Sequence, residues 1–173
     1  MTGLLSKSEL LAPAPVSETA DLADVLQAKG WLMATAESCT GGMIAAACTD
    51  LPGSSHWFER GFVTYSNAAK TELLGVDAGL IVTHGAVSEE VARAMVQGAI
   101  QRSCAQVAVA VTGVAGPGGG SAAKPVGTVW FGWITPSGPG GVVSEVQRFA
   151  GDRAAVRQQA VSHALRRLLQ LLR

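Results

Sequence analysis

The sequence has few of the residues that build metal sites, disulfide frameworks and aromatic stacking surfaces. Its 173 residues include three cysteines, three histidines and a single tyrosine. The cysteines at positions 39, 48 and 104 form neither a CxxC pair nor an even-numbered disulfide framework, and the histidines show no HxH or HxxxH spacing. We therefore expect no metal ion, and we expect reduced thiols in a cytoplasmic protein.

The chain also lacks an excess of charge of either sign. Thirteen Lys and Arg residues balance thirteen Asp and Glu residues, so nothing in the overall charge attracts nucleic acid or an anionic membrane. No uninterrupted apolar run approaches the roughly 20 residues needed to cross a bilayer. The first residues show no basic start followed by a sustained apolar stretch, so we expect no signal peptide. These absences favour a soluble protein whose partner is a small molecule.

The apolar pattern predicts one α/β domain. Strands are expected at 31–36, 58–65, 107–111, 127–134 and 142–149, and helices at 17–29, 43–48, 68–74, 88–101 and 152–172. A turn at 136–141 joins the last two strands as an antiparallel pair. We therefore expect a three-layer α/β/α sandwich with a mixed, mostly parallel β-sheet over residues 18–173. Residues 1–17 contain an Ala-Pro-Ala-Pro run and are predicted to be a flexible N-terminal extension.

Ser38 and Lys70 are the residues that indicate catalysis. Ser38 lies between a predicted strand and a helix; if that helix covers residues 40–48, its unpaired N–H groups near Cys39 and Thr40 can stabilise an oxyanion. A serine hydroxyl needs a base, and a lysine kept neutral by burial can serve as one. The ordinary alternative is a helix-capping serine and a solvated lysine, and spacing alone does not decide between the two.

Candidate substrate ligands lie at the ends of predicted strands. Tyr65 and Asn67 stand just before Lys70, where they could orient the lysine or bind substrate. Thr112 and Gly113 follow the strand at 107–111 and could present N–H groups to a phosphate or a ribose.

Two arginines open the last predicted helix. Arg153 is the best phosphate ligand in the sequence, and Arg157, one turn later, can assist it. Either arginine could instead pair with Asp152 or Glu145 at the surface.

Eight segments, in order along the chain, resemble the CinA C-terminal domain family. They are residues 35–42 (TAESCTGG), 52–55 (PGSS), 60–67 (RGFVTYSN), Lys70, 84–88 (HGAVS), 113–117 (GVAGP), 124–129 (KPVGTV) and 151–153 (GDR). The match runs from about residue 18 to the end of the sequence. Longer family members carry an additional N-terminal domain that resembles molybdopterin-binding proteins, and nothing here corresponds to it.

The resemblance implies a function and a set of roles. Stand-alone members of the family are nicotinamide-nucleotide amidohydrolases, which convert nicotinamide mononucleotide to nicotinate mononucleotide and ammonia in NAD salvage. The resemblance implies Ser38 as nucleophile and Lys70 as base. From its place just before Lys70 we expect Tyr65 as a further catalytic residue, and we expect no cofactor. The expected substrate-binding residues are Cys39, Thr40, Gly41, Asn67, Thr112, Gly113 and Arg153.

Two other functions stay open at this point. The chain could be a nucleotide-binding module without turnover. It could also be an amidase with another substrate that uses Cys39, because a thiol at a helix N-terminus would have a lowered pKa. The apolar faces of the predicted helices would also allow a homodimer.

Overall fold

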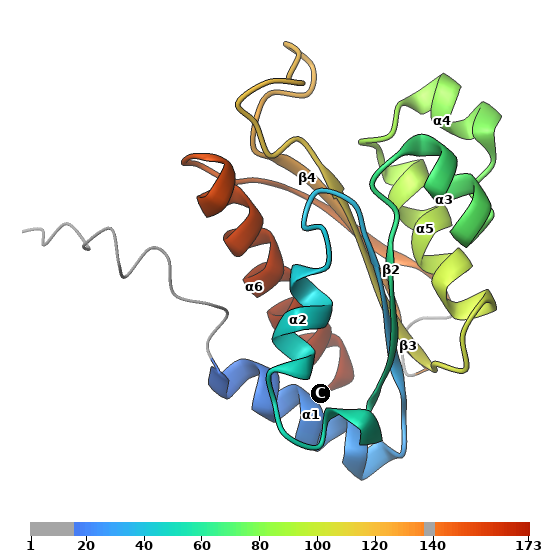
Figure 1. The fold of residues 1–173 in the computed structure, drawn as a ribbon, viewed down its shortest axis with the longest axis vertical. Helices are drawn as coiled ribbons and strands as arrows, with labels where there is room; N and C mark the ends of the chain where they lie inside the picture. Colours follow the sequence, from blue (N-terminus) through green and yellow to red (C-terminus); the bar gives the residue numbers. More distant parts are fainter. Residues whose placement is uncertain (1–15, 137–140) are drawn as a thin grey trace, which may run out of the picture.

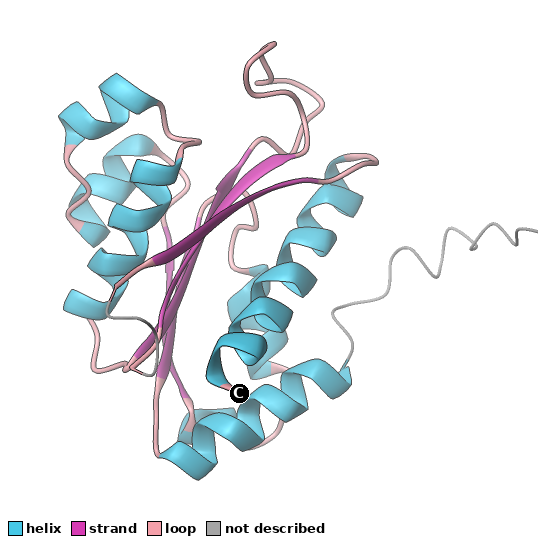
Figure 2. Cartoon of the chain, turned by 180° about the vertical axis from the view of Figure 1, so that it is seen from behind, coloured by secondary structure: helices cyan, strands magenta, loops and turns pink. Residues whose placement is uncertain are grey.

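The computed structural model describes residues 16–136 and 141–173. They form three layers, with one sheet between two layers of helices (Figure 1). Along the chain the elements are α1 (Val16–Lys29), β1 (Met33–Glu37), α2 (Met43–Thr49), a 3₁₀ turn (Ser54–His56), β2 (Phe58–Val63), α3 (Asn67–Leu74), α4 (Ala78–His84), α5 (Glu89–Gln101), β3 (Val107–Gly113), β4 (Thr128–Ile134), β5 (Val143–Arg148) and α6 (Arg153–Leu172). Helices α1, α2 and α6 cover one face of the sheet, and α3, α4 and α5 cover the other, as Figure 2 shows from behind.

The sheet has the strand order β2-β1-β3-β4-β5. β1 pairs in parallel with both β2 and β3, whereas β4 pairs antiparallel with β3 and with β5. Four of the five strands therefore run in one direction and β4 alone runs against them. The three-layer α/β/α sandwich with a mixed, mostly parallel sheet is confirmed.

Helix α6 contributes much of the hydrophobic core on one face of the sheet. Its buried face carries Val156, Ala160, Val161, Ala164, Leu165, Leu168, Leu169 and Leu172, at the spacing of an amphipathic helix. This face packs with α1 against β3 and β4, where the indole N–H of Trp133 donates to the Ala164 carbonyl at 3.1 Å. Fully burying one leucine of this stripe contributes about 1.5–3 kcal/mol. The long helix therefore holds its N-terminal end, and Arg153 with it, against the sheet.

Helix α5 contributes to the core on the other face of the sheet. One of its glycines, Gly98, lets α5 approach α3 closely. A Cβ at Gly98 would lie 2.1 Å from the Leu74 carbonyl oxygen, so a larger residue at this position would push the two helices apart. Ser88 caps α5 by accepting the N–H of Val91, and Glu89 and Glu90 occupy its first turn, where the helix dipole favours acids. The close contact of α5 with α3 matters because α3 carries Lys70.

The structure moves several predicted boundaries. β1 begins at Met33 rather than at residue 31, whereas α2 begins at Met43, as predicted for a helix at 43–48, and not at residue 40, where N–H groups facing Ser38 would require it to begin. α4 was not predicted at all, because its seven residues are too short to show a clear period. The predicted turn at 136–141 lies largely outside the described residues, as does most of the predicted extension at 1–17. Among the helices of residues 16–136 and 141–173, none is both long and apolar enough to span a membrane.

Candidate active site

The carboxyl ends of three neighbouring parallel strands meet at one edge of the sheet, where open α/β sheets bind their ligands. Ser38 follows β1, Thr64 follows β2, and β3 ends at Gly113. The backbone holds these ends in register: Ser38 N–H donates to the Val111 carbonyl at 2.9 Å, and Thr64 N–H donates to the Glu37 carbonyl at 2.8 Å. The sheet thus gives Ser38 a fixed backbone position between two other strand ends.

Ser38 and Lys70, 32 residues apart, meet at this edge. Lys70 Nζ lies 3.1 Å from Ser38 Oγ and 2.9 Å from the Thr64 carbonyl oxygen. Lys70 sits in α3, whose first turn is capped by the Ser66 hydroxyl accepting the N–H of Ala69 at 3.0 Å. The two side chains have the separation that a nucleophile and its general base need.

Burial sets the protonation of the lysine. Lys70 is 1% exposed, and none of the described carboxylates forms an ion pair with it. Desolvation lowers the pKa of Lys70 from its ordinary value of 10.5, and only the nearby Cys39 acts in the opposite direction. The amine is therefore easier to deprotonate than a surface lysine, as a general base for a serine requires.

The N-terminus of α2 is occupied by Glu37, and this corrects the prediction that helix N–H groups face Ser38. The buried Glu37 carboxylate accepts N–H groups from Gly42, Ile44 and Ala45 at 2.9–3.1 Å. The expected donors near Ser38 required a helix that begins at Thr40, and no role was predicted for Glu37. A carboxylate five to eight residues before these amides satisfies the donors that the helix leaves unpaired.

The turn between Ser38 and α2 nevertheless offers free donors. Gly41 N–H donates to the Ser38 carbonyl and Met43 N–H to the Thr40 carbonyl. Within residues 16–136 and 141–173, no carbonyl or side-chain oxygen accepts the backbone N–H groups of Cys39 and Thr40. Two amides directly after the serine therefore have no oxygen acceptor among the described residues, although neither belongs to the helix.

A cavity of about 200 Å³ opens onto this pair. Its lining includes eight of the ten candidate site residues, namely Ser38, Cys39, Tyr65, Asn67, Lys70, Thr112, Gly113 and Arg153, together with Ala86, Val87 and Ala115. The other two candidates do not line it. Thr40 is fully buried, and its hydroxyl has no hydrogen-bond partner in the described part of the chain, whereas Gly41 is exposed and has a φ of +59°.

Arg153 and Tyr65 lie together at the rim of this cavity. Arg153 donates to the Tyr65 hydroxyl and to the Gly116 carbonyl, each at 2.9 Å. Tyr65 is 60% exposed, and its hydroxyl contacts Arg153 rather than Lys70. Of the two roles that the sequence suggested for Tyr65, the geometry favours substrate contact over orientation of the lysine, which Thr64 already holds.

Cys39 does not have the environment expected of a nucleophile. Burial, assisted by the nearby Glu37 carboxylate, raises the pKa of its thiol to about 11, although its own backbone N–H, Arg157 and Lys70 act in the opposite direction. The prediction of a lowered pKa rested on a helix N-terminus at this position, and α2 begins four residues later. The thiol is therefore protonated near neutral pH.

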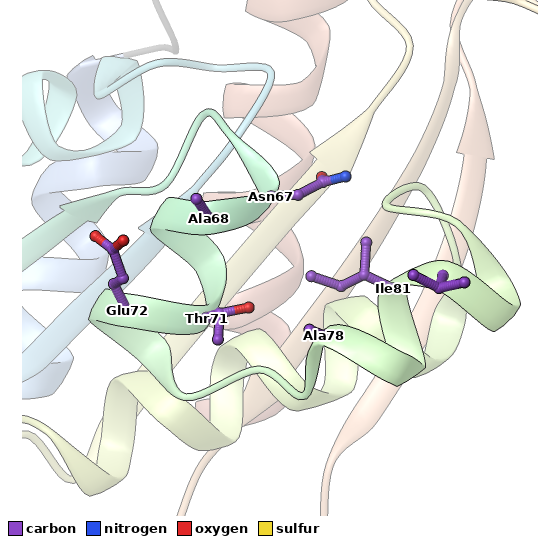
Figure 3. A pocket seen from close by; sticks show the side chains of 7 residues that line it. Asn67, Ala68, Thr71, Glu72, Ala78 and Ile81 are labelled. Carbon is purple, nitrogen blue, oxygen red and sulfur yellow. The ribbon is translucent and has the colours of Figure 1, made fainter.

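A larger hollow of about 350 Å³ lies between α3 and α4 (Figure 3). Its lining is mostly apolar, and Figure 3 shows the Glu72 side chain turned away from Ile81 and Ala78. Asn67 lines both hollows, but neither Ser38 nor Lys70 lines this one. In the described part of the chain, no three His, Cys, Asp or Glu side chains gather as a metal site would require. The smaller cavity is thus the candidate active site.

Residues 16–172 match the family model described as the CinA C-terminal domain. The chain belongs to the CinA C-terminal domain family. Curated relatives of the family include the nicotinamide-nucleotide amidohydrolase PncC of Enterobacter agglomerans, 55% identical over 87% of this chain and 90% of its own. The protein of the same name from Pseudomonas putida is 62% identical over 79% of this chain and 84% of its own.

Solved structures of the family have the same fold. A CinA superfamily protein from Escherichia coli is 38% identical, covers 99% of this chain and 95% of its own, and gives a TM-score of 0.86. The competence/damage inducible protein CihA from Agrobacterium tumefaciens is 42% identical, covers the whole of both chains, and gives a TM-score of 0.84. Longer relatives also occur: this chain matches 34% of a putative competence-damage inducible protein from Symbiobacterium thermophilum, at 54% identity.

Proposed function

We propose that this protein is a nicotinamide-nucleotide amidohydrolase that converts nicotinamide mononucleotide and water to nicotinate mononucleotide and ammonia. The observation that carries the proposal is the 3.1 Å contact between Ser38 Oγ and the buried Lys70 Nζ in a cavity at the sheet edge. The names of the relatives that match most of this chain supply the substrate class. Cavity and names point to the same reaction, hydrolysis of an amide.

The first half of the reaction follows from the positions of Ser38 and Lys70. The Lys70 amine, held by the Thr64 carbonyl, takes the Ser38 proton while Oγ attacks the carboxamide carbon. The N–H groups of Cys39 and Thr40 bind the developing oxyanion. The C–N bond then breaks, and the leaving NH₂ group takes the proton from Lys70 and departs as ammonia.

Water completes the reaction at the ester. Lys70 takes a proton from water as its oxygen attacks the ester carbon, and returns that proton to Ser38 Oγ when the ester bond breaks. The positive charge of the pyridinium ring makes the carbonyl carbon more electrophilic in both halves. Each proton that Lys70 accepts is given up again, so the enzyme returns to its starting state.

The rest of the cavity accounts for recognition of the nucleotide. The carboxamide enters the deep end beside the buried Lys70, and the phosphate lies at the rim, where Arg153 is exposed. An arginine already braced against Tyr65 and Gly116 grips an anion with less loss of side-chain freedom than an unrestrained one. Asn67, Thr112 and Gly113 also line the cavity, and they are the ligands that we propose for the ribose.

The role in NAD salvage follows from the proposed product. The cytoplasmic location and the homodimer expected from the sequence stay predictions, as does the division of the chain into an extension at 1–17 and a domain at 18–173.

Ammonia release from nicotinamide mononucleotide by the wild type and by Ser38→Ala, both with EDTA, tests the proposal. The reaction should appear with the wild type alone, while calorimetry finds the nucleotide bound by both proteins with similar affinity. Binding to both proteins without ammonia from either would instead make the chain a nucleotide-binding module. Equal ammonia release from both would remove Ser38 from the mechanism.

A further inference from the structure

Arg157 contacts the turn that follows Ser38. From α6 it donates Nε to the Cys39 carbonyl at 3.1 Å and Nη2 to the Thr40 carbonyl at 3.0 Å. These two residues follow Ser38 directly, and they lie more than a hundred residues before Arg157 in the sequence. Both contacts come from one planar guanidinium, which fixes the direction of the two carbonyl groups relative to each other.

The Cys39 carbonyl belongs to the same peptide group as the Thr40 N–H. A peptide group is planar and trans, so a guanidinium that holds its oxygen also fixes the direction of its N–H. That N–H has no acceptor among the described residues, as noted above. A cation on the oxygen also polarises the group, which makes the N–H a stronger donor.

The turn is also held at its other end, by Glu37. The carboxylate takes the N–H of Gly42, and Gly41 bends the chain with a positive φ of +59° between the two anchors. A Cβ at Gly41 would lie 3.4 Å from Arg157 Nη2, so the bend lies directly against the guanidinium. Glu37 thus fixes the amides of α2, while Arg157 fixes the peptide groups nearest the serine.

Arg157 and Arg153 occupy successive turns of one helix but have different neighbours. Arg153 reaches the cavity rim at Tyr65 and Gly116, whereas Arg157 does not line the cavity. The sequence suggested that Arg157 assists Arg153 with a phosphate, but its contacts are with the backbone of the nucleophile turn.

We propose that Arg157 is a positioning residue for amide hydrolysis. It holds the Cys39–Thr40 peptide group so that the Thr40 N–H stays directed to the developing oxyanion. The inference rests on the proposed amidohydrolase function. It assigns to Arg157 an effect on turnover, separate from the substrate affinity assigned to Arg153.

The test compares kcat and KM for nicotinamide mononucleotide in Arg157→Gln, Arg157→Lys and wild type. Because removing one oxyanion donor costs about 10²–10³ in kcat, misdirecting one should lower kcat of Arg157→Gln by about 10–100-fold with KM within about twofold. Arg157→Lys keeps the positive charge but cannot contact both carbonyls in the same way, so its kcat should lie between those of Arg157→Gln and the wild type. Methylguanidinium added to Arg157→Ala should restore part of the lost kcat.

Arg166→Gln is the matched control. Arg166 is an exposed arginine of the same helix, and its guanidinium pairs with Glu18 on α1, so its kcat and KM should equal those of the wild type. Thermal unfolding of each variant identifies any that does not fold, and Arg157→Lys then carries the comparison.

Three results would overturn the inference. A kcat of Arg157→Gln within twofold of the wild type would remove the positioning role, and so would a raised KM at unchanged kcat, which would make Arg157 a substrate ligand. A third result would be a low kcat of Arg157→Ala that methylguanidinium does not restore, together with a kcat of Arg157→Lys as low as that of Arg157→Gln. Arg157 would then act only through its packing. Absence of ammonia release from the wild type would instead overturn the proposed function on which the inference rests.

Discussion

Replacement of Lys70 by methionine removes the amine but keeps a side chain of similar length in the same buried place. General-base catalysis by a positioned side chain contributes about 10²–10⁴ in rate. We therefore expect kcat for ammonia release to fall by this factor, which corresponds to about 2.7–5.4 kcal/mol of activation free energy. KM should change little, because Lys70 contacts Ser38 and Thr64 at the deep end of the cavity rather than at its rim.

The pH dependence gives the same prediction a second readout. Only the neutral amine can take the Ser38 proton, so kcat of the wild type should rise with pH and level off below 10.5, because burial lowers the pKa of Lys70 from that value. Between the lowered pKa and 10.5, the unfolded chain binds a proton that the folded chain does not. The free energy of unfolding of the wild type should therefore rise with pH in this window relative to that of Lys70→Met.

The assay needs a control that loses a lysine elsewhere. Lys29→Met, at the end of α1 and over the Trp31 ring, should keep wild-type turnover and the wild-type pH profile. Turnover of a folded Lys70→Met within tenfold of the wild type would refute the role of the lysine. So would a wild-type rate that does not change with pH below 10.5.

Three further substitutions test separate parts of the site. Cys39→Ala should keep kcat within about threefold, because burial raises the pKa of this thiol to about 11; inactivation by the substitution would make Cys39 the nucleophile. Arg153→Ala should raise KM for the mononucleotide about 10–100-fold, as loss of a charged hydrogen bond predicts, and an unchanged KM would place the phosphate elsewhere. Glu37→Gln turns an amide N–H₂ toward the α2 N–H groups and should lower the free energy of unfolding by about 1–3 kcal/mol in urea titrations; wild-type stability would contradict the capping role.

Much of the fold could be predicted from the sequence, because the long strands and helices show apolar patterns within their own residues. The strand at 107–111 is a continuous apolar run, and the helix at 152–172 carries an apolar stripe at helical spacing; they appear in the structure as β3 and α6. Helix α4 shows the opposite case, since seven residues give too little period to detect. The start of α2 at Met43 agrees with the predicted helix at 43–48, but the earlier start at Thr40 was wrong, because Thr40 and Gly41 form a turn that Glu37 and Arg157 hold from outside the helix.

The candidate site likewise has features that the sequence predicts and features that it does not. Strand ends can be read from the sequence, and Ser38, Tyr65, Thr112 and Gly113 all follow or end a strand, so their meeting at one edge was predictable. The burial of Lys70 was not, because it depends on how closely α3 packs on α5 at Gly98. The contacts of Glu37 and Arg157 were missed because each is with backbone amides or carbonyls, which no residue pattern records.

Trapping of the acyl group by hydroxylamine tests the central claim, that Ser38 forms an ester with the substrate carbonyl. An ester at Ser38 can be attacked by hydroxylamine instead of water, so the wild type should convert nicotinamide mononucleotide to the corresponding hydroxamate with release of ammonia. Ser38→Ala should form neither product. Ammonia and nicotinate mononucleotide without hydroxamate at saturating hydroxylamine, or hydroxamate formed by Ser38→Ala, would contradict the covalent role of Ser38.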